Sequence, residues 1–274
     1  MRGPVASPPA CSWVSRVRRR PESKGAWGRE RSAAPDAWGT YDRVVDPNTE
    51  AIIRLAWARI LGLPDDALDT PATDVLTRTD DSVISYVRLW DHRVLIGHQW
   101  AHSLAPALAR DDAGVATTLL TAAADHGGRL LGRAHLAFTD TYVPGPHLET
   151  AVVTDDRAAV VDLEASCPPD DVTEVGLAGM ARALVTLDEL DRPTAGAGYE
   201  EWQGIVAHLG VLTPPPFRRQ GHGLTAAGIA TNDALDAGLV PQWRVRTENR
   251  ASRRVAARLG FREVGTQTTV LLTA

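Results

Sequence analysis

Between residues 211 and 224 the chain reads VLTPPPFRRQGHGL, an apolar strand end followed by a proline run and a glycine-rich helix start. Proline supplies no backbone donor to a sheet, so the run at 214–216 ends the strand. The first turn of a helix exposes unpaired N–H groups and a partial positive charge, which attract anions. Gly221 and Gly223 lack a Cβ and let a phosphate approach the main chain, while Arg218 and Arg219 add positive charge. The stretch therefore predicts a phosphate-binding loop.

A regular succession of strands and helices surrounds this loop. Short runs rich in Val, Ile, Leu and Thr alternate with segments of helical periodicity. We expect strands at 150–154, 182–188, 194–200, 204–213, 242–247 and 263–272, and helices following Asp156 and at 171–179, 220–237 and 250–259. This order predicts the α/β class, with a mixed α+β sheet covered by helices on its faces.

A second motif lies at the start and end of the helix at 250–259. Residues 249–252 read NRAS, and residues 259–261 read LGF. Together with the pattern Arg218-x-x-Gly221-x-Gly223, this segment resembles the (Gln/Arg)-x-x-Gly-x-(Gly/Ala) loop and the last helix of the GCN5-related N-acetyltransferases, the GNAT family. The resemblance covers about residues 147–274 and implies the GNAT acyl-CoA N-acyltransferase fold in that part of the chain.

The resemblance also implies an acetyl-CoA site that needs no metal. In the family, acetyl-CoA lies in a V-shaped gap between two parallel strands, which would be the strands at 204–213 and 242–247. One wall would offer main-chain groups to the pantetheine arm, the glycine loop would hold the pyrophosphate, and the second helix start would line the other wall. The implied residues are Val211, Leu212 and Thr213, then Arg218, Arg219, Gln220, Gly221, His222, Gly223 and Leu224, and finally Asn249 and Ser252.

The resemblance gives less guidance on catalytic groups. Family members transfer the acetyl group directly to an amine, often with a tyrosine acid and a strand glutamate base; the matching positions here hold Ala256 and Ala207. The nearby candidates are His208, whose ring titrates near neutral pH, and Glu201 in the preceding turn, with Glu200 beside it. His208 equally fits a packed side chain with one hydrogen bond, and the two glutamates equally fit a solvated turn.

The part of the chain before residue 147 lacks the family motifs. Residues 1–40 are rich in Pro, Gly, Ser and Arg without apolar periodicity, which predicts a disordered basic extension. A nucleic-acid-binding arm, with stacking by its tryptophans, is the sharper alternative. The pattern of residues 41–146 predicts a smaller α+β region. Pro144-Gly145-Pro146 is the expected linker between this region and a GNAT domain at 147–274. Its expected elements are a helix from Asp46 to Ile60, strands at 83–90, 94–96 and 130–139, and helices at 99–110 and 115–125.

Composition narrows the classes of partner. The formal net charge of −5 gives no reason to expect nucleic acid, and the two cysteines, Cys11 and Cys167, form no disulfide framework. No apolar run reaches the roughly 18 residues of a membrane span. His98 and His102 have a helical spacing that suits a metal, but no third ligand is evident, so no metal site is expected. We expect a cytoplasmic protein with no membrane partner, and the oligomeric state stays open, a homodimer included.

These patterns predict an acetyl-CoA-dependent N-acetyltransferase that transfers directly to a primary amine of an unidentified acceptor. The negative charge of the chain fits a cationic acceptor loosely. The alternative is a non-catalytic acyl-CoA-binding or sensing protein with a degenerate GNAT domain. That alternative stays open because the tyrosine and the strand glutamate are absent.

Overall fold

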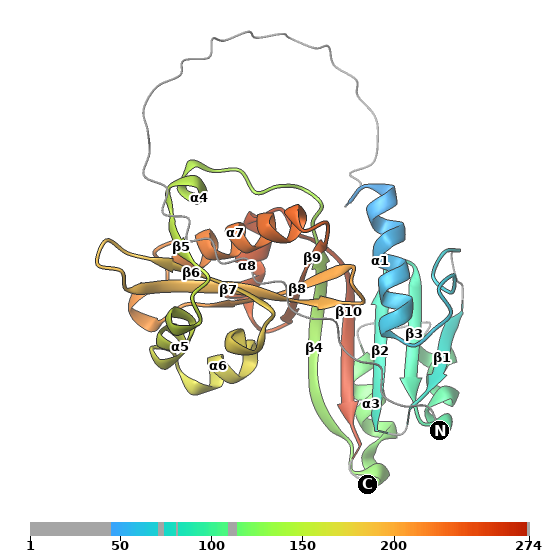
Figure 1. Cartoon of the computed structure of the whole chain (residues 1–274). Coiled ribbons are helices and arrows are strands. Elements are labelled where there is room, and N and C mark those ends of the chain that lie inside the picture. Colours follow the sequence, from blue (N-terminus) through green and yellow to red (C-terminus); the bar gives the residue numbers. More distant parts are fainter. Residues whose placement is uncertain (1–44, 71–73, 81, 109–113, 273–274) are drawn as a thin grey trace, which may run out of the picture. The chain divides into compact units, whose positions relative to one another are not determined.

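The computed structural model of the chain describes residues 45–70, 74–80, 82–108 and 114–272. These residues build one mixed sheet of ten strands in the order β1-β3-β2-β10-β4-β9-β8-β7-β6-β5 (Figure 1). The strands are β1 (Val75–Thr79), β2 (Val83–Leu89), β3 (His92–Gly97), β4 (Arg129–Phe138), β5 (Val152–Thr154), β6 (Arg182–Leu187), β7 (Pro193–Trp202), β8 (Val206–Leu212), β9 (Val240–Arg246) and β10 (Arg262–Leu271).

Helices cover both faces of this sheet. The α-helices are α1 (Pro47–Ile60), α2 (Ala105–Leu108), α3 (Val115–Ala122), α4 (Pro146–Thr150), α5 (Arg157–Ala165), α6 (Pro169–Val175), α7 (His222–Asp236) and α8 (Arg250–Arg258). Short 3-10 turns are η1 (Gln99–Leu104), η2 (Ala124–His126), η3 (Leu177–Gly179) and η4 (Pro215–Phe217). No helix among the described residues has the length and apolar content needed to cross a membrane.

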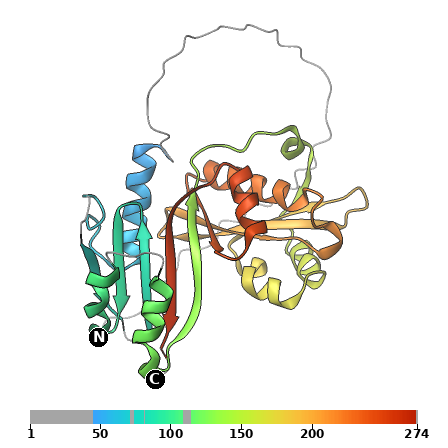
Figure 2. The ribbon, with the colours of Figure 1, turned by 180° about the vertical axis from the view of Figure 1, so that it is seen from behind.

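The two faces have separate cores. On the α1 face, Trp57 of α1 packs over Val206, and Leu163 of α5 packs with Leu212. On the α7 face, Ala230 of α7 and Ala256 of α8 pack over β7, β8 and β9, and α3 covers β2 and β10. Figure 2, seen from behind, shows α3 and α8 in front of the strands. Hereafter the sheet face under α1, α5 and α6 is called the α1 face, and the other is called the α7 face.

The expected fold class, a mixed α+β sheet with helices, is confirmed, and most expected elements are present within about two residues of their expected ends. The prediction of a single helix at 99–110 is wrong. Its described part is the 3-10 turn η1 followed by α2, because Pro106 has no N–H and cannot lie inside one continuous helix. The strand β1 was not expected, since VLTRT is short and only two of its five residues are apolar.

Strand β4 connects the two parts of the chain that the sequence separates. It pairs antiparallel with β9, from Ala134↔Arg246 to Phe138↔Gln242, and with β10 along its whole length. The described residues between 45 and 272 accordingly belong to one compact unit. The expected boundary at residue 146 stays a prediction about folding units, and the extension expected at 1–40 lies outside the described residues.

Candidate functional site

Two parallel strands in the middle of the sheet diverge. β8 and β9 pair only at Val206↔Val240, Ala207↔Pro241 and His208↔Gln242. Beyond these pairs β8 continues along β7 as far as Leu212, and β9 continues along β4 as far as Arg246. The facing edges at 209–212 and 243–246 therefore do not pair with each other. This is the V-shaped gap that the family resemblance implies.

The glycine loop closes one end of the gap and leads into α7. Gly221 is the N-cap of α7 with φ of 95°, and the first intrahelical bond runs from Thr225 N to Gly221 O at 3.0 Å. Within the described chain, no side chain accepts from the amides of His222, Gly223 and Leu224. A Cβ placed on Gly221 would meet no atom within 4 Å, whereas one on Gly223 would lie 2.6 Å from Thr213 Oγ1, so the free space lies beside Gly221. The loop thus fits an anionic group held by backbone N–H donors.

The polar side chains of the loop are mostly engaged in bracing it. Arg218 donates from Nε to the Thr213 carbonyl at 2.9 Å and from Nη2 to Asp171 of α6 at 2.6 Å. Gln220 donates to the Pro216 carbonyl at 2.6 Å. Arg219, exposed at φ of 62°, carries the positive charge that is left for a ligand. Among the described residues Arg218 Nη1 has no hydrogen-bond partner, so a phosphate would share this guanidinium with Asp171.

The remaining side chains of this segment pack against neighbouring protein groups. The His222 ring lies edge-on to Phe217, with 5.5 Å between ring centroids. Leu212 is buried among α5 and α6, whereas Val211 and Leu224 pack partly exposed on the α7 face. Val211 and Leu212 can therefore offer a ligand their main chain rather than their side chains.

The start of α8 forms the opposite wall. Asn249 caps the helix by accepting from Ser252 N at 3.0 Å, and Ser252 Oγ accepts from Trp243 Nε1 at 2.9 Å. Trp243 packs edge-on to Phe261 with 5.3 Å between ring centroids. These contacts fix α8 against β9. Ala256, at the position where the family often has tyrosine, is only 5% exposed in the apolar core.

His208 stands at the last paired position before the gap. Its Nδ1 lies 3.2 Å from Gln242 Nε2, and Gln242 Oε1 accepts from Trp57 Nε1 at 2.9 Å. An indole N–H can only donate, so the Trp57 indole holds Gln242 with its oxygen toward Trp57 and its Nε2 toward His208. Gln242 Nε2 then donates to His208 Nδ1, and the neutral His208 ring carries its proton on its own Nε2. Burial, followed by the charge of Arg244, lowers the pKa of His208 to about 4. The ring is neutral near pH 7, and its lone pair is already engaged with Gln242.

The two candidate catalytic residues do not lie together. Glu201 pairs with Ala207, whereas Glu200 pairs with His208. Because successive strand residues point to opposite faces, Glu201 belongs to the α7 face and His208 to the α1 face. Trp202 stacks on His208 with 4.2 Å between ring centroids, and its Nε1 is 3.5 Å from Glu200 Oε2. Glu200, and not Glu201, therefore shares a face with His208.

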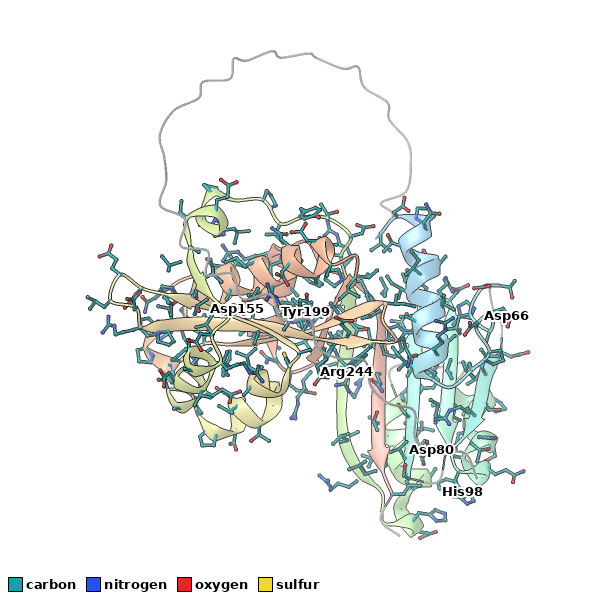
Figure 3. The ribbon with its side chains drawn as sticks, in the orientation of Figure 1. Asp66, Asp80, His98, Asp155, Tyr199 and Arg244 are labelled. Carbon is teal, nitrogen blue, oxygen red and sulfur yellow. The ribbon has the colours of Figure 1, made fainter. Side chains whose placement is uncertain are left out.

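Arg244 was missed at the sequence level. It follows Gln242 on the same face of β9, and its Nε donates to Gln267 of β10 at 3.0 Å. Arg244 is labelled in Figure 3. The sequence pattern that could have identified it is the alternation of residues 242–246, because a strand over these residues places Gln242, Arg244 and Arg246 on one face.

An ionic network on the α7 face was also missed. Asp233 of α7 accepts from Arg182 of β6 at 2.7 Å and 3.0 Å and from the Tyr199 hydroxyl at 2.8 Å (Tyr199 and Asp155 are labelled in Figure 3). Burial raises the pKa of Asp233, but the hydrogen bonds from Arg182 and Tyr199 outweigh it and leave the pKa below its usual value. Arg182 also contacts Asp155 at 3.1 Å. The network fixes α7 to the sheet. Among the described residues, no three His, Cys, Asp or Glu side chains gather as metal ligands.

No family model and no curated protein matches the chain. Many of the solved structures that do match it are GNAT-family N-acetyltransferases. A GCN5-related N-acetyltransferase from Kribbella flavida is 22% identical with a TM-score of 0.42, and the match covers 59% of this chain and 65% of that one. A GCN5-related N-acetyltransferase-like protein from Streptococcus suis is 18% identical with a TM-score of 0.41, over 57% of this chain and 67% of that one.

A third match is a GCN5-related N-acetyltransferase from Sphaerobacter thermophilus. It is 15% identical with a TM-score of 0.42, over 57% of this chain and 56% of that one. The chain thus spans about two thirds or less of the length of these three solved structures. GNAT-family N-acetyltransferases are thus among the solved structures to which this chain is similar.

Proposed function

We propose that this protein is an acetyl-CoA-dependent N-acetyltransferase that transfers the acetyl group directly to a primary amine. One observation carries the proposal: β8 and β9 diverge after three pairs, and the end of β8 leads through the glycine loop to the open amides of α7. Unpaired strand edges and an uncapped helix start are the groups that an extended, phosphate-bearing thioester would need.

Each part of the donor would meet a different element. The unpaired edge at 209–212 offers main-chain donors and acceptors to an amide-bearing arm. The amides of residues 222–224 offer hydrogen bonds to a pyrophosphate, with Arg219 beside them. When bound, acetyl-CoA supplies an acetyl group activated as a thioester.

The reaction requires two proton movements. The amine nitrogen forms a bond to the acetyl carbon, the carbon–sulfur bond breaks, the amine loses a proton and the thiolate gains one. Glu200 is the carboxylate that shares the α1 face with His208, so it replaces Glu201 as our candidate base. The buried Ala256 cannot supply an acid, which leaves solvent to protonate the thiolate, a moderate leaving group near neutral pH.

A second function is favoured by a different observation. Ala207 is fully buried and Ala256 is 5% exposed, so the family's usual base and acid positions are both filled by apolar core. A protein that binds acyl-CoA and senses it, without turnover, would tolerate these residues.

Calorimetric titration of the full chain with acetyl-CoA, compared with coenzyme A, tests both functions. Saturable one-to-one binding at micromolar concentration, followed by amine-dependent release of the thiol, supports the transferase. Binding without thiol release for a broad panel of primary amines favours the sensor. No binding at millimolar acetyl-CoA rejects both.

A further inference from the structure

The two faces of the gap have different uses under the proposed function. The groups expected to hold the donor, at the starts of α7 and α8, lie on the α7 face. With that face occupied by the donor, an amine would reach the thioester from the α1 face. The side chains that border the gap on the α1 face therefore contact the acceptor.

Arg244 is the cation at that border. It follows Gln242, the last β9 residue paired with β8 on this face, and its side chain is exposed. Its Nε is bound to Gln267, but among the described residues its Nη1 and Nη2 have no hydrogen-bond or ionic partner. Arg246, two residues on, instead pairs with Glu174 of α6 at 3.5 Å.

The surroundings of Arg244 leave its charge without compensation. The groups that share its face on the nearby strands are His208 on β8, Gln267 on β10 and Ser85 on β2, and none of them carries negative charge near pH 7. Glu200 lies two strands away on β7. Although the side chain is accessible, protein surrounds much of it, and this burial, followed by the charge of Arg246, lowers the pKa of Arg244.

We infer that Arg244 binds a carboxylate of the acceptor, which makes the acceptor an amine that also carries a carboxylate group, as an amino acid does. This inference rests on the proposed function. A planar guanidinium with two free NH2 groups, Nη1 and Nη2, matches a carboxylate in a bidentate arrangement. The net charge of the whole chain is −5. Salt screens exposed charges over about 10 Å, so an acceptor at the gap is attracted by the nearby Arg244 more than it is repelled by distant acidic residues.

The test compares matched acceptors on the full-length protein. Thiol release is measured with each common amino acid that carries a primary amine and with its α-carboxamide, for the wild type and for Arg244→Gln. We expect at least one acid to exceed its amide about tenfold in kcat/KM in the wild type, and the ratio to fall to about one in Arg244→Gln. Acetyl-CoA affinity, measured by calorimetry, should change by less than about twofold in the variant.

Two further variants sharpen the test. Arg246→Gln removes a charge from the same face of the same strand, but one already paired, so it should keep the preference for the acid. Arg244→Lys keeps the positive charge but loses the planar guanidinium that binds a carboxylate through two nitrogens. The ratio of kcat/KM for the acid to that for the amide should therefore fall to an intermediate value. If acetyl-CoA binds but no acid is preferred to its amide, the inference is overturned while the donor site stands. If acetyl-CoA does not bind, the proposed function itself fails.

Discussion

A short chain of buried polar groups sets the chemistry beside the gap. Trp57 on α1, Gln242 on β9 and His208 on β8 are far apart in the sequence, but their side chains form two consecutive hydrogen bonds. Gln242 is fully buried, so losing either partner would leave a desolvated amide group unsatisfied, at a cost of about 1–3 kcal/mol. The neutral form of His208 is therefore part of the folded state.

The first residue-scale prediction concerns acid stability. The pKa of His208 is about 4 in the folded state, below the ordinary 6.5 of the unfolded chain. The unfolded state binds the proton first, so this stabilisation is present above pH 6.5 and is lost as the pH falls from 6.5 towards 4. One pKa unit corresponds to about 1.4 kcal/mol, which limits the loss to about 3 kcal/mol.

Urea unfolding of the wild type and of His208→Asn at pH 7 and pH 4.5 measures the effect. The free energy of unfolding should fall by about 2 kcal/mol more in the wild type than in the variant. An equal fall in both proteins would mean that His208 is not protected from protonation.

The second residue-scale prediction concerns the glycine loop. Gly221 and Gly238 lie at the two ends of α7, both have positive φ, and a Cβ at either would meet no atom within 4 Å. Replacing either by Glu should therefore cost about 1–2 kcal/mol of backbone strain. Only Gly221→Glu places bulk and negative charge before the open amides, so it should weaken acetyl-CoA binding by about a hundredfold or more in calorimetry. Comparable affinity in the two variants would remove the loop from the binding site.

At the scale of elements, glycines let the helices of the α1 face pack close to the strands. A Cβ on Gly196 of β7 would overlap Leu163 of α5 and lie 2.7 Å from Leu177 of η3, and one on Gly198 would overlap the Arg182 carbonyl. These positions are fully packed, and they fix α5 and η3 beside the end of β8. The geometry of the gap thus depends on packing around β7, the strand next to β8.

We predict that Gly196→Ala destabilises the protein by about 1–3 kcal/mol through overpacking. The matched test is a double-mutant cycle with Leu163→Ala, which removes the side chain that the new methyl group would strike. In that background Gly196→Ala should cost at least about 1 kcal/mol less. Additive costs in urea unfolding would show that the strain arises elsewhere.

The elements that the sequence predicted well are those specified by local contacts. Asp156 and Asn249 cap their helices through bonds to residues two and three positions away, and both starts were expected correctly. The face of Glu201 could not be predicted, because it depends on the register of β7 against β8. The role of Arg244 also required tertiary structure, since its neighbours come from β8 and β10. Local chemistry specifies elements, whereas register and packing decide which side chains meet.

At the scale of the whole molecule, β4 makes the two parts of the chain interdependent. It lies between β9 and β10, although it precedes the expected domain boundary. Leu136 and Phe138 are fully buried, and they pack with α1 and with the strands of the C-terminal part. Without β4, both β9 and β10 would expose unpaired edges and apolar surface, a template for aggregation.

We therefore predict that residues 147–274 do not fold alone, even though they contain the whole glycine loop and both walls of the gap. Residues 42–274 should unfold cooperatively and bind acetyl-CoA as the full chain does, whereas the shorter fragment should aggregate or unfold without a cooperative transition. Urea unfolding followed by far-UV circular dichroism and calorimetric titration compares the two. A matched control is the variant Leu136→Asp in residues 42–274, which places a charge in the fully buried part of β4 and should reproduce the failure of the fragment. A cooperatively folded fragment that binds acetyl-CoA would instead make residue 146 a true domain boundary, with β4 an accessory strand of the sheet.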